Sequence, residues 1–355
     1  MPSYPVAPPL QGKPILEPIE GTEDDSMKAV VFHNVISDPL DEFDRQLYRK
    51  HINGFTRAIK VLREQYEIIS LPEMLSRLES GDPAPNALTI TFDDGFAGVY
   101  DFARPVLAEA GATATAFILT EPPLPGHSGT VSENRLLHFE VLEIAFRLTQ
   151  RTSLDVADLG LGQLDLTSPS QTARDMNRIK SELKRLPASI SGPIHHRILE
   201  DLAVSPDEIE AYAARFPKYQ KLSASQIAAL RHEGWTIGGH TRNHPALSSL
   251  DEATLHSELA GNLQDLSTLF GLTHPPLAYP YGAPALVGPQ APEVARQAGF
   301  SCAFTTVQEP ITPSTNRFHL GRYGEDDLLH SQGRDIAAWA ARQRGNPTIS
   351  DTPSS

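Results

Sequence analysis

Short β-branched runs alternate with helix-like segments along the first third of the chain. Apolar residues fill the runs Met27–Val35, 87–92 and 114–119, which predicts buried strands. Between Asp41 and Gln65, apolar residues instead recur at helical spacing, at Phe43, Leu47, Ile52, Phe55, Ile59 and Leu62. Strands and helices that alternate in units of about 25 to 35 residues indicate βαβ units, and hence a parallel sheet or barrel.

This alternation stops near residue 122 and resumes near residue 222. The residues between begin with a Pro/Gly-rich stretch and continue with helical patterns, so we interpret 122–222 as a helical insertion between two barrel elements. The chain then divides into a Pro-rich, acidic and extended lead-in (1–26), a barrel with its insertion (27–330), and a short helix with a disordered tail (331–355).

Composition narrows the classes of function. The 355 residues are 40% hydrophobic, enough for a large core, and the net charge of -14 disfavours nucleic acid as a partner. That charge favours a neutral or cationic substrate. The single cysteine, Cys302, requires no oxidising compartment, and no apolar run approaches the roughly 18 residues of a membrane span. Because no signal peptide is recognisable, we expect a cytoplasmic protein, with a secreted protein whose leader has been removed as the alternative.

The stretch LTITFDDGF places two adjacent carboxylates at the end of a predicted strand. Functional side chains of parallel α/β barrels gather at the carboxyl ends of the strands. Successive strand residues point to opposite faces, so Asp93 and Asp94 can serve one site only if the backbone turns, and Gly95 permits such a turn. An ordinary surface turn is the competing interpretation.

Two histidines, His240 and His244, follow the predicted strand 236–240 in the stretch GGHTRNHPAL. If Thr241 onward forms a helical turn, both imidazoles lie on one face and can bind one metal ion. Two histidines and one carboxylate form a three-ligand site with open positions, as in hydrolytic zinc sites. The second carboxylate is then free to accept a proton from attacking water.

A third stretch, LAYPYGAP (Leu277–Pro284), places a Pro-aromatic-Gly turn at the end of a predicted strand. Such a turn can aim a backbone N–H at the oxyanion of a tetrahedral intermediate, or it can be an ordinary connection.

Together and in this order, TFDDG, HTRNH and YPYG closely resemble motifs of the polysaccharide deacetylase family with NodB homology, carbohydrate esterase family four. The resemblance spans roughly residues 27–323. It implies an irregular (β/α)7 barrel and metal-dependent removal of N-acetyl, sometimes O-acetyl, groups from sugars. By motif position it implies Asp93 as general base, Asp94, His240 and His244 as metal ligands, the backbone N–H of Tyr281 as oxyanion donor, and Pro280 with Tyr281 as the walls of the acetyl pocket.

The chain also departs from the family pattern. Many members open the third motif with an arginine that orients the catalytic aspartate, where this chain has Ala278; Arg322, in HLGRYG, is the arginine that we expect at the aspartate or the substrate. The Asp/Trp-containing fourth motif has no counterpart. His319, in FHLG, is the nearest candidate for the general-acid histidine of the fifth motif. His33, at the end of the first strand, is a candidate substrate contact.

The sequence therefore predicts a metal-dependent hydrolase that deacetylates N-acetylhexosamine units of a glycan or glycoconjugate. One divalent ion is expected, zinc first, with cobalt, nickel, manganese or iron as alternatives. Two other functions stay open: an amidase, deformylase or O-acetyl esterase of the same fold acting on a smaller substrate, and a carbohydrate-binding barrel without activity. The expected partner is an N-acetylated sugar or glycan, without nucleic acid or a membrane span, and the sequence leaves a homo-oligomer open.

Overall fold

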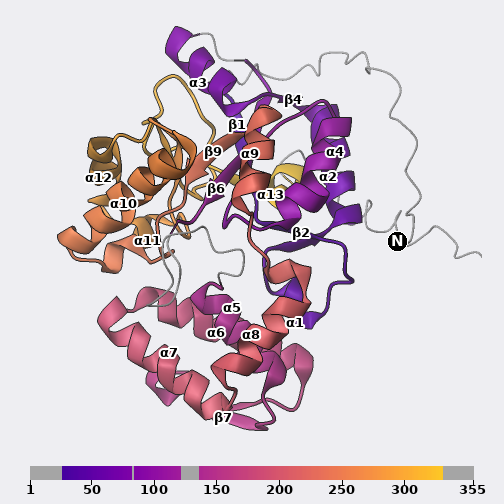
Figure 1. Cartoon of the computed structure of the whole chain (residues 1–355), viewed down its shortest axis with the longest axis vertical. Helices are drawn as coiled ribbons and strands as arrows, with labels where there is room; N and C mark the ends of the chain where they lie inside the picture. The colour runs from indigo at the N-terminus through magenta and orange to yellow at the C-terminus, as the bar shows by residue number, and fades with distance from the viewer. Residues whose placement is uncertain (1–25, 82–83, 121–135, 331–355) are drawn as a thin grey trace, which may run out of the picture.

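The computed structural model describes residues 26–81, 84–120 and 136–330 (Figure 1). Its centre is a curled parallel sheet in the order β11-β10-β9-β6-β5-β1-β12, with β4 paired to the start of β5. The strands are β1 (Lys28–Phe32), β4 (Glu67–Ile68), β5 (Ala87–Phe92), β6 (Thr115–Ile118), β9 (Thr236–Gly239), β10 (Leu277–Ala278), β11 (Ala303–Phe304) and β12 (Tyr323–Gly324). Leu320, just before β12, forms a parallel bridge with Phe304 of β11, so the last segment touches both edges of the sheet.

Helices surround this sheet on its outer face (Figure 1). They are α2 (Ile52–Gln65), α3 (Leu71–Ser80), the π-helix η1 (Val99–Ala103), α4 (Arg104–Glu109), α9 (Ala224–His232), α10 (Glu252–Phe270), α12 (Ala291–Ala298) and α13 (Glu325–His330), with the short η4 (Leu247–Ser249) and α11 (Pro284–Val287). Ser70, Ser223 and Asp251 cap helix starts with their side chains. All six residues of β5 are buried, as expected of a strand covered on both faces. The predicted α/β barrel is confirmed.

The predicted helix from Asp41 to Gln65 is wrong in its first half. The chain instead forms the single turn α1 (Glu42–Arg45), then β3 (Arg49–His51), and only then α2. Strand β3 pairs in parallel with β2 (Asn34–Ile36). The extended backbone directs Arg49 inward, where its Nη1 donates to Asp44 at 2.9 Å and to Glu143 at 2.6 Å. A buried ion cluster therefore overrides the helical periodicity.

The insertion forms its own layer beneath the barrel in Figure 1. Its elements are α5 (His138–Leu148), the antiparallel pair β7 (Ser153–Asp155) and β8 (Gln163–Asp165), η2 (Ala157–Leu159), α6 (Pro169–Arg185), α7 (Ala188–Leu202), α8 (Pro206–Arg215) and η3 (Pro217–Tyr219). It has a separate apolar cluster, which Phe43 of α1 joins. Buried ions also attach it to α1, because Lys218 Nζ donates to Asp44 Oδ1 at 2.8 Å.

Among the described residues, no helix combines the length and apolar character that crossing a membrane requires. The predicted tail helix at 334–344 and almost all of the lead-in lie outside the described residues.

Candidate active site

The backbone turns immediately after β5, at the aspartate pair. Asp94 has φ 70° and Gly95 has φ 64°, so both residues adopt the left-handed conformation. Glycine adopts it without strain, whereas aspartate tolerates it at some cost. Asp93 is 3% exposed, and Asp94 is half-buried. The turn that the sequence predicts at Gly95 is confirmed, and it sends the two carboxylates to different neighbours.

Asp94 meets His240 and His244, the pair that follows β9. The Nε2 atoms of both histidines lie 3.3 Å from Asp94 Oδ1. One ligand atom from each of the three residues lies within 4.8 Å of the other two. The imidazole of His240 also contacts the carbonyl of Ala278 through Nδ1 at 2.7 Å. A proton on Nδ1 would leave the Nε2 lone pair facing Asp94, as in histidines that bind metals.

The loop that carries the two histidines is not the helical turn considered from the sequence. Residues 240–246 form no helix, and Thr241 and His244 both have positive φ, 67° and 60°. Helix α10 shapes this loop instead: Glu258 Oε2 accepts the backbone N–H groups of Arg242 at 3.0 Å and Asn243 at 2.9 Å. The convergence of the imidazoles therefore depends on tertiary support rather than on helical spacing.

A second residue of α10 supports the strand end before the loop. Asn262 is fully buried, and its Nδ2 donates to the carbonyl of Thr241 at 2.9 Å. A Cβ on Gly239 would lie 2.1 Å from Asn262 Oδ1, so this close approach requires glycine. Sequence reasoning missed both Glu258 and Asn262. Their signal is a pair of polar residues, four positions apart, within the buried stripe of an amphipathic helix.

The donor set fits a divalent cation. Asp94 Oδ1 is buried and accepts no hydrogen bond with acceptable geometry from the described residues. Burial would raise the pKa of Asp94, but the neighbouring imidazoles of His240, His244 and His33 hold it well below its usual value. Burial lowers the pKa of His244 to about 3. An ionised carboxylate and a neutral imidazole are the protonation states that metal binding requires.

Asp93 turns away from this cluster and pairs with Arg322. The guanidinium donates to both carboxylate oxygens, from Nη1 at 2.7 Å and from Nη2 at 2.8 Å. Its Nε donates to the carbonyl of Thr305 at 3.0 Å, and Arg322 is only 1% exposed. Burial would raise the pKa of Asp93, but the charge of Arg322 outweighs it and lowers that pKa. This geometry favours a positioning role for Arg322 over contact with substrate.

Tyr281 lies beside His244 and has φ 62°. Its ring packs edge-on against the His244 ring, with centroids 4.6 Å apart, and its hydroxyl donates to the carbonyl of His244 at 3.4 Å. The backbone N–H of Tyr281 donates to no described residue, which is what an oxyanion donor requires. Pro280, directly before it, is buried.

The structure brings one of the two other predicted histidines to the site. His33 stacks on Tyr48, with ring centroids 4.7 Å apart. His33 follows Phe32, whose carbonyl accepts the backbone N–H of Asp93 at 3.0 Å, so it stands at the strand end next to the aspartate pair. His319 is exposed in a turn, where its backbone N–H donates to Asn316, and no described contact joins it to the aspartates.

Comparisons with known proteins agree with this geometry. Residues 199–303 match the family model described as polysaccharide deacetylase; they include both histidines and Tyr281 but not the aspartate pair. The chain matches no curated protein in sequence.

Two solved structures share the fold. A structure described as Streptococcus pyogenes deacetylase PplD in complex with acetate aligns over 86% of this chain and 96% of that one, with 14% identity and a TM-score of 0.52. The structure of IcaB from Ammonifex degensii aligns over 90% of this chain and 98% of that one, with 17% identity and a TM-score of 0.51.

The matched segment contains the HTRNH and YPYG motifs, and the two solved structures show a shared fold. Over residues 199–303 the chain therefore resembles the polysaccharide deacetylase family, which agrees with the resemblance that its motifs indicate.

Proposed function

We propose that the protein is a metal-dependent hydrolase that removes N-acetyl groups from N-acetylhexosamine units of a glycan or glycoconjugate. One observation carries this proposal: adjacent carboxylates have different partners. Asp94 faces His240 and His244, whereas Asp93 is fixed by Arg322 and remains outside that cluster. Hydrolysis of an amide at a metal site uses both kinds of carboxylate, a ligand and a base.

Asp94, His240 and His244 would hold the cation. A divalent ion bound there, with zinc expected and cobalt, nickel, manganese or iron as alternatives, would polarise the acetyl carbonyl and make water a stronger nucleophile. Asp93 accepts a proton as the water oxygen forms its bond to the carbonyl carbon. The N–H of Tyr281 donates to the oxyanion, and Pro280 and Tyr281 line the space for the acetyl methyl group.

The carbon–nitrogen bond then breaks, which yields acetate and an amino sugar. The departing nitrogen needs a proton, which Asp93 holds after the first step. His33 follows β1 at the strand end next to that of the aspartates and is the better placed of the two candidate histidines for contact with substrate or for assisting this transfer. His319 is retained only as an alternative acid, because it is exposed and bonded within its own turn.

A smaller amide or an ester is the second candidate substrate, because the insertion covers part of the site. Phe139 of α5 and Lys184 of α6 both pack on the ring of Tyr281, with the Phe139 centroid at 6.0 Å and Lys184 Nζ at 4.4 Å. A covered site would favour short chains or chain ends over the middle of a long polymer.

Release of acetate distinguishes these functions. Purified protein, stripped with a chelator and reloaded with zinc, should release acetate from N-acetylglucosamine oligomers, and the stripped protein should not. Formamides and O-acetyl esters tested in parallel cover the second candidate. If reloaded protein released acetate from no amino sugar, the proposed function would be wrong.

A further inference from the structure

Two lysines of the insertion lie side by side next to the metal cluster. Lys180 and Lys184 are one turn apart on α6, so they share one face of the helix. Both ammonium groups lie over the ring of Phe139, at 5.4 Å and 5.2 Å from its centroid. Two like charges held this close repel each other, so their position calls for a physical reason.

Neither lysine has a carboxylate partner among the described residues. Lys180 is only 6% exposed, yet it forms no ion pair or hydrogen bond there. The other two buried lysines behave differently, because Lys218 pairs with Asp44 at 2.8 Å and Lys221 with Glu140 at 2.9 Å. A buried cation without a counterion is costly, and buried charges in proteins are normally paired.

The lysine pair faces the proposed reaction centre. Lys184 Nζ lies 4.4 Å from the centroid of the Tyr281 ring, and that ring packs on His244. Lys180 lies over the ring of Phe139, and that ring packs edge-on against Tyr281 with centroids 6.0 Å apart. Burial lowers the pKa of Lys180 to about 8, so the group still carries most of its charge at neutral pH.

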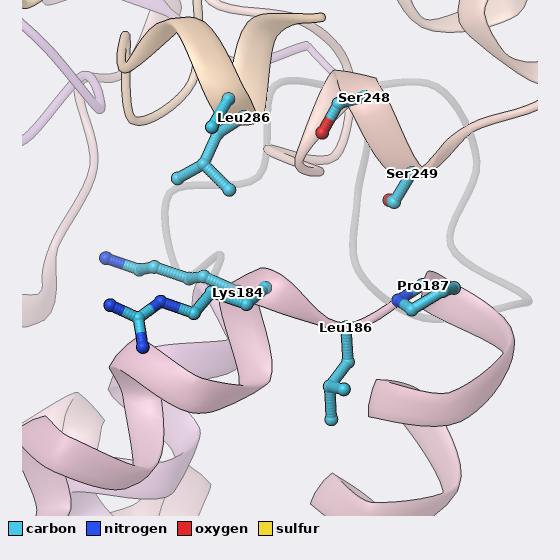
Figure 2. A pocket seen from close by; sticks show the side chains of 8 residues that line it. Lys184, Leu186, Pro187, Ser248, Ser249 and Leu286 are labelled. Carbon is cyan, nitrogen blue, oxygen red and sulfur yellow. The ribbon is translucent and has the colours of Figure 1, made fainter.

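A pocket of about 410 Å³ opens beside Lys184, between the insertion and the barrel (Figure 2). Lys184, Leu186 and Pro187 line one side, and Ser248 and Ser249 of η4 with Leu286 of α11 line the other. This volume lies within the range of roughly 300–1,000 Å³ that is usual for small-molecule sites. Lys184 lines this pocket and also contacts the ring of Tyr281, so it connects the pocket to the acetyl side of the proposed site.

We propose that Lys180 and Lys184 bind an anionic substituent, a carboxylate or a phosphate, on the sugar unit next to the one that is deacetylated. The substrate class is then an acidic N-acetylated glycan. This inference rests on the proposed deacetylase function. An anion between the two ammonium groups relieves their repulsion and supplies the counterion that the described residues do not. The overall charge of -14 favoured a neutral or cationic substrate, but the two charged residues that line the pocket, Lys184 and Arg185, are cations.

The test compares kcat/KM for acetate release from three oligosaccharides of equal length: neutral N-acetylglucosamine oligomers, oligomers alternating with a uronic acid, and oligomers carrying a sugar phosphate. Wild-type protein should prefer one anionic series by about tenfold or more, the usual worth of a charged hydrogen bond, and the preferred series identifies the anion. Lys184→Gln should lose this preference, so that kcat/KM for the preferred anionic oligomer falls about tenfold further than kcat/KM for the neutral oligomer. Lys184→Arg should retain the preference, and Lys180→Gln should weaken it.

The matched control is Arg178→Gln, which removes one positive charge from the exposed side of the same helix, where Arg178 pairs with Asp175. It should change neither rate. The inference would be overturned if Lys184→Gln lowered kcat/KM equally for neutral and anionic oligomers, or if wild-type protein preferred neither. Acetate release would still support the proposed function in both cases. Calorimetry with a fully deacetylated oligomer that contains uronic acid measures anion binding apart from catalysis. Binding that depends on Lys184, without acetate release from any substrate, would support an anion site at Lys184 and reject the deacetylase function.

Discussion

Arg322 donates a hydrogen bond to each carboxylate oxygen of Asp93, although 229 positions separate the two residues in the chain. The residue directly before β12 thus fixes the carboxylate that follows β5. In the family pattern, an arginine at the place of Ala278 performs this orientation, so the present chain has an arginine of different origin beside the same aspartate. We interpret Arg322 as the residue that keeps the carboxylate of Asp93, the proposed general base, ionised and correctly oriented.

Asp93→Asn removes the proposed base while preserving shape. Asparagine can still accept a bond from Arg322 but cannot take up a proton from water. We expect kcat to fall about 10²-fold to 10⁴-fold, the usual worth of a positioned base, with the metal content unchanged. Steady-state acetate release and metal analysis on the same preparation check both parts. Turnover at the wild-type rate would contradict the role of Asp93.

Arg322→Met tests the ion pair by removing the partner of Asp93. It leaves Asp93 as a buried charge without its partner, and breaking a buried ion pair in this way costs about 3–5 kcal/mol in the free energy of unfolding. Denaturant titration should show that loss. Adding Asp93→Asn to the same chain should recover much of it, because the stranded charge is gone. Additive losses in the double variant would contradict the proposed coupling.

Glu258 should support the metal site without touching the metal. It holds the loop of His244 through the backbone N–H groups of Arg242 and Asn243. Glu258→Gln should weaken metal affinity about 10-fold to 100-fold, the range seen when outer supports of metal ligands are lost. Glu252→Gln, in the exposed first turn of the same helix, is the matched control and should leave the affinity unchanged. Competition with a chromophoric chelator measures both.

Acid should loosen the attachment of the insertion to the barrel. Burial would raise the pKa of Glu143, but the charge and hydrogen bond of Arg49 outweigh it and lower that pKa from 4.5 to about 2. Because the folded value lies below the unfolded one, the stabilisation is complete above about pH 4.5 and is lost as pH falls towards 2. The loss is on the order of 3 kcal/mol, at about 1.4 kcal/mol for each pH unit.

Urea midpoints measured between pH 6 and pH 3 test this expectation, with Glu143→Gln as the comparison. Because other carboxyls also titrate in this range, the difference between the two proteins is the informative quantity. The midpoint of wild-type protein should fall more steeply with acid than that of the variant. Parallel curves would show that Glu143 does not stabilise the fold in this way.

The sequence predicted those features of the fold that depend on residues close together in the chain. The strand before Asp93, the turn at Gly95 and the strand before His240 follow from runs of apolar residues and a glycine. The break in the helix expected between Asp41 and Gln65 does not, because Arg49 is drawn inward by Glu143, which lies 94 positions away. The spacing of apolar residues indicates which positions are buried, but it does not indicate which distant residue they contact.

The parts of the site that depend on distant segments were harder to predict. The loop of His240 and His244 has two residues at positive φ and is held by polar groups of α10, so spacing alone suggested the wrong backbone. Lys184 reaches Tyr281 from the insertion, whose packing no motif describes. Two long-range contacts were anticipated: the grouping of Asp94 with the two histidines, and the contact of Arg322 with Asp93, which we expected because the family resemblance implies an arginine there and this chain has Ala278 in the usual place.

The most direct test of the central claim is metal stoichiometry. Wild-type protein stripped by chelator and equilibrated with zinc should hold about one ion per chain by atomic emission, and His244→Ala and Asp94→Ala should each hold far less at the same free zinc. A full equivalent retained by both variants, or no zinc bound by correctly folded wild-type protein, would contradict a site made by Asp94, His240 and His244.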